Sequence, residues 1–271
     1  MGIFDTVVDG ATQIAEYGVG GAQRLQDIVG PVERFGIQTL GLPSAKNLDD
    51  RELVWLLGLA AFDSYTLNGE CRGKLKVTFR QLQNLKDANM LNDIQFGVYE
   101  VKKGRHRGKK ILAYRGTDVE NEASGVMTLV QDASLCLPNV RYLGQPIKEA
   151  ISCAVKNAQL HRPDYICGHS LGGLLAECVC SETGLPGASF NAPGPWATTP
   201  ENNLLSGTEY DGVQFEVHLT KNDPVSLYGG YLGPECSHVG HPVWHPGVGI
   251  KKNDLIANHK MELMLNDLEK R

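Results

Sequence analysis

Apolar and polar positions show two patterns along the chain, short apolar runs typical of strands and helical spacing typical of helices. The runs Phe96–Val101 and Lys110–Tyr114 predict two strands joined by a glycine-bounded turn. Apolar residues at helical spacing predict a helix from Glu52 to about Phe62, with Asp49 or Asp50 as its N-cap. The same patterns predict strands at Tyr165–Cys167, Ala188–Phe190 and Phe215–Leu219, and helices over Ile147–Ala158, from Leu171 onward and over Ile256–Glu269. Strands alternating with helices imply crossover connections, and therefore an α/β fold with a mainly parallel central sheet flanked by helices.

The first 48 residues differ in composition from the rest of the chain. They are dense in glycine, and lysine is absent before Lys46. Apolar residues between Ile3 and Ala15 repeat at helical spacing, so we expect an N-terminal helical extension over residues 1–48 and a main domain over residues 49–271. The alternative is a contact with a membrane or a partner protein, since Met1–Thr6 also fits the loose myristoylation pattern.

The overall composition is that of an ordinary globular protein. The chain has 271 residues, of which 42% are hydrophobic and 21% charged, which argues against disorder, collagen and coiled coil. A chain of this length buries a sizeable core without a metal or a disulfide. The net charge is −5, so the chain as a whole is not basic as nucleic-acid-binding proteins are, and no nucleic-acid partner is expected.

Cysteine usage and hydropathy favour a reduced, soluble setting. The seven cysteines are scattered and form no CxxC pair, so neither a zinc site nor a redox motif is supported. The start of the chain has no secretory signal pattern, and apolar runs such as Trp55–Phe62 are too short to span a bilayer. Six basic side chains within Lys102–Lys110 predict a solvated hairpin tip, with contact to anionic lipid headgroups as the alternative. We therefore expect a cytoplasmic or unconventionally secreted protein with at most peripheral membrane contact.

One segment carries the main chemical signal, Gly168-His169-Ser170-Leu171-Gly172-Gly173. It lies between a predicted strand and a predicted helix, the setting of a nucleophile elbow that exposes a serine hydroxyl. The flanking glycines allow close backbone approach, because a Cβ there would crowd the turn. The turn also places the backbone N–H of Leu171 at a helix N-terminus, where it can meet a developing negative charge. Ser170 is therefore the candidate nucleophile, and a structural serine in a glycine-rich turn is the alternative.

A serine hydroxyl needs a base and an acid that orients the base. Asp223 follows the predicted strand Phe215–Leu219, and parallel-sheet enzymes present active groups beyond the carboxyl ends of their strands. An Asx-turn aspartate before Pro224 is the alternative. For the base we favour His259, at the start of the predicted last helix, with His245 and His241 in reserve.

The remaining downstream histidines leave another interpretation open. His238, His241 and His245 lie in a proline- and glycine-rich stretch near Trp244, which predicts a loop. They are equally compatible with hydrogen-bonded structural histidines or with ligands of an adventitious metal.

A second oxyanion donor is expected from the backbone N–H of Thr117, which follows a strand and a glycine. An ordinary turn after a strand is the alternative there.

Taken together, these segments resemble the class 3 (fungal-type) lipases. The segments are Arg115-Gly116-Thr117, Gly168–Gly173, Asn222-Asp223-Pro224-Val225 and His259, with weaker support from Ser189–Gly194 and His238–Trp244. The resemblance covers about residues 50 to 265. It implies an α/β-hydrolase fold, no cofactor, and hydrolysis of lipid acyl esters. It also implies Ser170 as nucleophile, Asp223 and His259 as the rest of the triad, and Thr117 and Leu171 as the oxyanion hole.

Some features depart from that family. His241 stands where the family often has glutamate, and neither a secretion signal nor a disulfide pattern is evident. The family's lid would fall at about Val119–Gln131, an acidic and then apolar stretch for which a simple connecting helix is the alternative.

The sequence thus predicts a serine esterase or lipase that acts on a lipid or a small ester without a metal. Three alternatives stay open. The first is a membrane-acting phospholipase, such as a secreted effector. The others are a non-enzymatic signalling protein on a lipase scaffold, and another acyl hydrolase such as a thioesterase or peptidase.

Overall fold

The structure is a computed structural model, and it describes residues 44–66, 78–84, 94–116, 144–197, 203–221, 223, 225, 236–240, 242–248 and 257–270. The predicted N-terminal extension lies outside these residues except for its last five. In that segment Ala45 and Leu48 are buried, and Ala45 forms a β-bridge with Gly240. Residues 44–48 therefore pack against the main body. For the residues before 44, the division of the chain near residue 48 stays a prediction.

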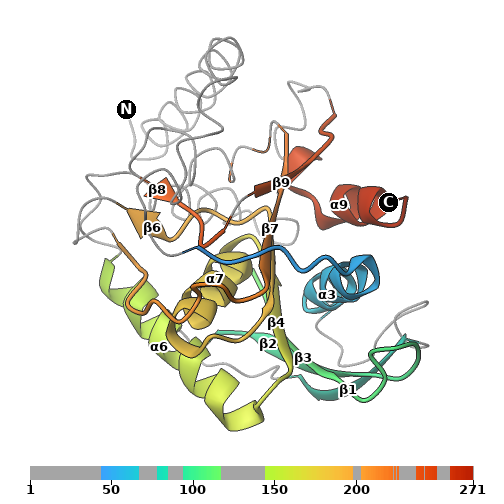
Figure 1. Ribbon diagram of the computed structural model, residues 1–271, viewed down its shortest axis with the longest axis horizontal. Helices are drawn as coiled ribbons and strands as arrows, with labels where there is room; N and C mark the ends of the chain where they lie inside the picture. Colours follow the sequence, from blue (N-terminus) through green and yellow to red (C-terminus); the bar gives the residue numbers. More distant parts are fainter. Residues whose placement is uncertain are drawn as a thin grey trace, which may run out of the picture.

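A seven-stranded mixed sheet forms the centre of the molecule, with the strand order β1-β2-β3-β4-β5-β7-β9 (Figure 1). The strands are β1 (Phe79–Asn84), β2 (Phe96–Val101), β3 (Lys110–Tyr114), β4 (Tyr165–His169), β5 (Gly187–Phe190), β7 (Phe215–Thr220) and β9 (Pro242–His245). β1, β2 and β3 pair antiparallel, and the pairs from β3 to β9 are parallel. β6 (Trp196–Ala197) and β8 (Cys236–Ser237) form a separate short antiparallel pair. The predicted α/β fold with a mainly parallel central sheet is confirmed.

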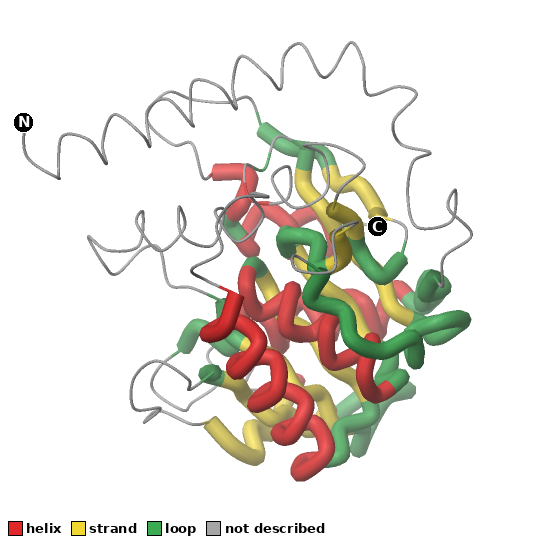
Figure 2. Tube along the Cα trace, turned by 90° about the vertical axis from the view of Figure 1, so that its left-hand side faces the viewer, coloured by secondary structure: helices red, strands yellow, loops and turns green. Residues whose placement is uncertain are grey.

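Helices cover both faces of the sheet (Figures 1 and 2). α3 (Arg51–Asp63) and α9 (Met261–Leu268) pack together on one face, and α6 (Gly144–His161) and α7 (Leu171–Thr183) pack together on the other. Successive residues of β3 explain the two layers, because side chains alternate between the faces of a strand. Ile111 and Ala113 belong to the core with α3, whereas Leu112 and Tyr114 belong to the core with α6 and α7.

The ends of the predicted elements agree closely with the structure where local chemistry sets them. β2 and β3 have the predicted bounds. The Asp50 side chain accepts the backbone N–H of Leu53 at 3.0 Å, so Asp50 rather than Asp49 is the N-cap of α3. α7 begins at Leu171, as predicted, and ends at Thr183, followed by Gly184 in the left-handed conformation that suits a helix C-terminus.

Two predictions near the C-terminus are wrong. The single helix over Ile256–Glu269 is divided into a 3₁₀ turn, η2 (Ala257–His259), and α9, because Lys260 between them is extended with φ −66° and ψ 132°. His259 therefore ends a short turn and does not begin the last helix. The stretch predicted as a loop contains β9, which pairs with β7; its first residue is Pro242, a position where a strand tolerates proline.

Candidate active site

The parallel strands bring three chemically important segments to one edge of the sheet. β4, β5 and β7 pair in register and point the same way, so their carboxyl ends meet at the same edge. Ser170 follows β4, Asn191 follows β5, and Asp223 comes three positions after the end of β7. The edge therefore gathers residues that are far apart in the sequence.

Ser170 occupies a strained turn between β4 and α7. Its backbone has φ 59° and ψ −131°, a region that non-glycine residues rarely adopt and that costs of order 1–3 kcal/mol. The turn is held by the Ser170 N–H, which donates to the carbonyl of Phe190 at 2.9 Å. The hydroxyl does not cap α7, so it is available for another partner.

The glycines of this turn are required by close backbone packing, as predicted. A Cβ on Gly168 would clash with the carbonyl of Gly172, and a Cβ on Gly172 would clash with the carbonyl of Tyr114. A Cβ on Gly173 would lie 2.7 Å from the Cβ of Ala192. Since two of these three obstacles are backbone atoms, only glycine fits without moving the strands.

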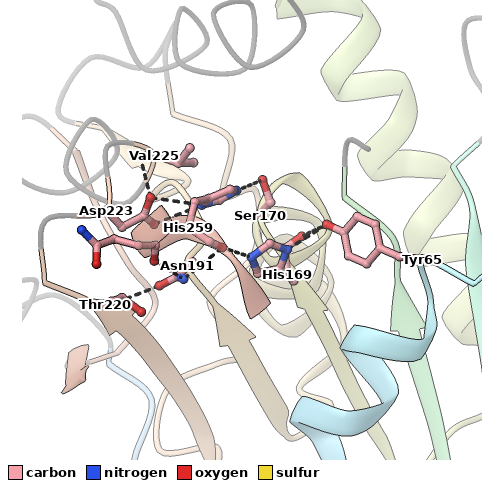
Figure 3. Close-up of polar contacts among 9 residues, drawn as sticks. Tyr65, His169, Ser170, Asn191, Thr220, Asp223, Val225 and His259 are labelled. Carbon is pink, nitrogen blue, oxygen red and sulfur yellow. Dashed lines mark hydrogen bonds and ion pairs between the residues drawn. The ribbon is translucent and has the colours of Figure 1, made fainter. Parts of the chain in front are cut away.

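Ser170, His259 and Asp223 form one hydrogen-bonded chain (Figure 3). His259 Nε2 lies 2.8 Å from Ser170 Oγ, and His259 Nδ1 lies 3.1 and 3.2 Å from the two carboxylate oxygens of Asp223. An ionised carboxylate only accepts hydrogen bonds, so Nδ1 carries the ring proton and Nε2 accepts from the serine hydroxyl. All three side chains are buried, which strengthens the electrostatic coupling between them.

Asp223 is oriented by its own turn. Its Oδ1 accepts the backbone N–H of Val225 at 3.1 Å, and its own N–H donates to the carbonyl of Thr220 at 3.2 Å. This is the Asx turn considered as an alternative from the sequence. The turn and the contact with His259 occur together, because the turn fixes the carboxylate that the imidazole meets.

Asn191 connects the segments that carry Asp223 and His259, a contact the sequence did not reveal. It is fully buried, and its Oδ1 accepts the N–H of Thr220 at 2.7 Å. Its Nδ2 lies 3.1 Å from the carbonyl of Asn258 and 3.3 Å from that of His259. The resemblance of Ser189–Gly194 to a family segment pointed to this loop, but the partners of Asn191 lie 67 and 68 positions away.

His245, the alternative candidate for the base, is hydrogen-bonded to residues other than Ser170. Its Nδ1 lies 2.6 Å from an Asp267 carboxylate oxygen, and its Nε2 lies 2.8 Å from Nδ1 of His218. His238 contacts the buried carboxylate of Glu177 at 2.9 and 3.2 Å. The structure thus places His259, and not His245 or His238, against Ser170; His241 lies outside the described residues.

The predicted oxyanion donors are only partly within the described residues. Leu171 is the first residue of α7, so its N–H has no carbonyl partner within the helix. Thr117 and the predicted lid over Val119–Gln131 lie outside the described residues. Gly116 precedes Thr117, and a Cβ built on it would lie 2.9 Å from Ser170 Cβ. The chain at Gly116, one residue before the expected donor, therefore lies close to Ser170.

The described residues hold no group of three or more metal-ligating side chains. The buried thiols of Cys167, Cys178 and Cys180 are free, and burial raises the pKa of each well above its ordinary value, so these cysteines act as small apolar residues. Among the helices that the structure describes, none has the length and apolar character needed to cross a bilayer.

Comparison with known proteins finds similarity at the level of solved structures. No protein-family model and no curated protein sequence matches the chain. The crystal structure of Lip2 lipase from Yarrowia lipolytica matches with a TM-score of 0.45 and 13% identity, covering 83% of this chain and 92% of that one. A nonglycosylated form of the same lipase matches with a TM-score of 0.44 and 12% identity, covering 74% and 81%. Similarity this distant says nothing about substrate, so function has to be inferred from the residues of this chain.

Proposed function

We propose that this protein is a serine hydrolase that cleaves carboxylic esters of lipids through an acyl-enzyme on Ser170. The observation that carries the proposal is the contact of 2.8 Å between Ser170 Oγ and His259 Nε2, with Asp223 on the other ring nitrogen. A serine that only stabilises a turn has no use for a buried imidazole and carboxylate in line with its hydroxyl. The strained backbone at Ser170 also favours a functional role.

The proposed reaction has two halves. Ser170 Oγ attacks the ester carbonyl carbon while its proton moves to His259 Nε2, and the carbonyl oxygen becomes an oxyanion. The C–O bond to the alcohol then breaks, and the imidazolium returns its proton to the leaving alcohol. In the second half water attacks the acyl-enzyme with His259 as base, and the acid is released with the Ser170 hydroxyl restored.

Three groups would stabilise the charges that develop on the imidazole and on the substrate oxygen. The carboxylate of Asp223 stabilises the imidazolium and keeps the ring proton on Nδ1. The N–H of Leu171, together with the proposed donor Thr117, would donate hydrogen bonds to the oxyanion at the N-terminus of α7, where the helix dipole is positive. Removal of one such donor typically costs about 10²- to 10³-fold in turnover.

Lipid esters are the proposed substrates because the segments around Ser170, Asp223 and Arg115 resemble those of class 3 lipases. The basic hairpin does not favour the phospholipase alternative. It precedes β3, whereas Ser170 lies beyond the carboxyl end of β4, which runs parallel to β3. The hairpin is therefore at the opposite edge of the sheet, and binding it to an anionic surface would turn the proposed active site away from the lipid.

Fluorophosphonate labelling with peptide mapping, run beside an ester panel graded by chain length, tests the proposal. We expect covalent labelling at Ser170 and hydrolysis of esters, and we expect Ser170→Ala to lose both while its circular dichroism is unchanged. Ester turnover that persists in Ser170→Ala would refute the mechanism. A folded wild-type protein that is neither labelled nor active would favour the non-catalytic signalling alternative. Faster turnover of anionic phospholipid vesicles than of soluble esters would favour the phospholipase.

A further inference from the structure

A second hydrogen-bonded chain reaches the backbone of His259 (Figure 3). It runs from the hydroxyl of Tyr65, just beyond α3, to the ring of His169 and on to the backbone carbonyl of His259 (Figure 3). Tyr65 Oη lies 2.8 Å from His169 Nδ1, and His169 Nε2 lies 2.7 Å from His259 O. The chain involves the backbone of His259, so it is separate from the path that carries the proton.

The partners at each end fix the protons of this chain. A carbonyl oxygen only accepts, so His169 Nε2 carries the ring proton and donates to His259. His169 Nδ1 is then a bare nitrogen, and the Tyr65 hydroxyl donates to it. His169 is therefore held in one tautomer and one orientation by the two groups it touches.

Burial keeps His169 neutral in this arrangement. Burial of the ring, with the neighbouring imidazole of His259 as the second cause, lowers the pKa of His169 to about 3. The two ring centroids are 4.7 Å apart. A positive charge on His169 would oppose the imidazolium that the proposed mechanism forms on His259, so a neutral ring is the form compatible with that mechanism.

The carbonyl of His259 is hydrogen-bonded by side chains and not by a backbone N–H of the following helix. Lys260 is extended, and the N–H of Leu263, four residues after His259, donates to the carbonyl of Lys260 at 3.2 Å. The carbonyl of His259 is instead met by His169 at 2.7 Å and by Asn191 Nδ2 at 3.3 Å. A carbonyl has two lone pairs, so these two donors saturate it.

We propose that His169, oriented by Tyr65, is a positioning residue that holds the backbone of His259 and thereby sets the imidazole against Ser170. The inference rests on the proposed function, because positioning matters only if His259 acts as a base. His169 directly precedes Ser170, so one tight turn places both the nucleophile and the support of its base.

Tyr65 is itself anchored beside the segment that leads to Thr117. The guanidinium of Arg115 lies 5.6 Å from the centroid of the Tyr65 ring, a cation–π distance. A Cβ on Gly116 would clash with both the Tyr65 hydroxyl and the His169 carbonyl. The same tyrosine therefore contacts the residues before the expected oxyanion donor and the residue before the nucleophile.

Four variants test the positioning role. His169→Leu removes the donor to His259, whereas His169→Gln retains an amide N–H near the place of Nε2. Tyr65→Phe removes only the hydroxyl that orients His169. Tyr114→Phe is the matched control, since the buried hydroxyl of Tyr114 donates at 2.9 Å to the carbonyl of Ala154 in α6, away from the triad.

For a short soluble ester we expect His169→Leu to lower kcat by about 10²-fold with little change in KM, the effect of a misplaced catalytic group. Tyr65→Phe should lower kcat by about 3- to 10-fold, and His169→Gln should recover most of the activity lost in His169→Leu. Tyr114→Phe should match the wild type in kcat even if its Tm falls. Wild-type kcat in His169→Leu, or an equal loss in His169→Leu and His169→Gln, would overturn the inference.

Nitrogen NMR of histidine-labelled protein tests the same role without turnover. The His259 ring should show one fixed tautomer in the wild type and in Tyr114→Phe, and averaged ring-nitrogen shifts in His169→Leu. Unchanged His259 shifts in His169→Leu would refute the positioning role. Failure of the proposed function looks different, because an inactive and unlabelled wild-type protein would still give these NMR results.

Discussion

The carboxylate of Asp223 meets Nδ1 of His259 through both of its oxygens, at 3.1 and 3.2 Å, although the residues lie 36 positions apart. Both side chains are buried, so bulk water does not screen the contact. The Asx turn to Val225 holds the carboxylate independently of the imidazole. Asp223 is therefore pre-oriented, and its effect on the tautomer of His259 can be tested with a small substitution.

Asp223→Asn should leave the fold intact and nearly abolish turnover. The amide oxygen of asparagine can keep the Asx turn with Val225, but its NH₂ group donates to Nδ1 and favours the tautomer with the proton on Nε2. That ring cannot accept the proton of Ser170. We expect kcat to fall by about 10⁴-fold, measured with the preferred ester of the panel. A loss of less than tenfold in a folded variant would argue against Asp223 as the orienting acid.

His259→Ala should mainly lower activity, whereas His245→Ala should mainly lower stability. His259→Ala removes the only imidazole that the described residues place against Ser170, and we expect a loss of about 10⁴- to 10⁶-fold in kcat. His245→Ala removes contacts to Asp267 and His218 and should lower the free energy of unfolding by about 1–3 kcal/mol, with kcat within a few-fold of wild type. Urea unfolding and ester kinetics measure the two effects, and the reverse pattern would reassign the base.

Gly172→Ala should destabilise the protein much more than Gly58→Ala. The methyl group at position 172 would clash with the backbone carbonyl of Tyr114, which cannot move without distorting β3, so we expect a cost of about 3 kcal/mol or more. At Gly58 in α3 the methyl group would meet side-chain ends of Leu268 and Leu265 at 3.1 and 3.2 Å, and alanine favours the helix. The control should lie within about 1 kcal/mol of wild type in urea unfolding. Equal destabilisation by both would show that the turn has room for a Cβ.

Stability should fall on acidification because His169 is buried in its neutral form. Its folded pKa is about 3, against an ordinary value of 6.5, so between these values the unfolded chain binds a proton that the folded protein does not. Stability therefore rises with pH across this window and falls as pH drops, by up to about 1.4 kcal/mol per pH unit.

The His169→Gln variant isolates this contribution. The pKa values of Glu216 and Asp164 are lowered from 4.5 and 3.8, so these carboxyls affect stability mainly at lower pH. We expect the difference in unfolding free energy between wild type and His169→Gln to shrink or reverse in favour of the variant as pH falls from 6.5 to 5. Parallel pH profiles for the two proteins would contradict a buried neutral His169.

Local patterns were sufficient to predict most of the elements around the site. Alternating apolar runs gave the bounds of β2 and β3, and the glycine-rich segment after β4 predicted the turn at Ser170. β1 and β9 were not predicted, because β1 is polar in sequence and β9 begins with Pro242. The break at Lys260 was also missed, since apolar spacing continues across it.

The sequence by itself determined the layered α/β architecture and the chemistry of the turn that carries Ser170, because side-chain periodicity and steric limits at glycine act over a few residues. Among four histidines downstream of Asp223 it favoured His259, from its place at the start of the predicted last helix and from the family resemblance. Only the tertiary structure placed His259 against Ser170, and only there do Asn191 and His169 contact its backbone, with Tyr65 on the ring of His169. Those contacts join residues from 68 to 104 positions apart, and they depend on parallel strands whose carboxyl ends meet at one edge of the sheet.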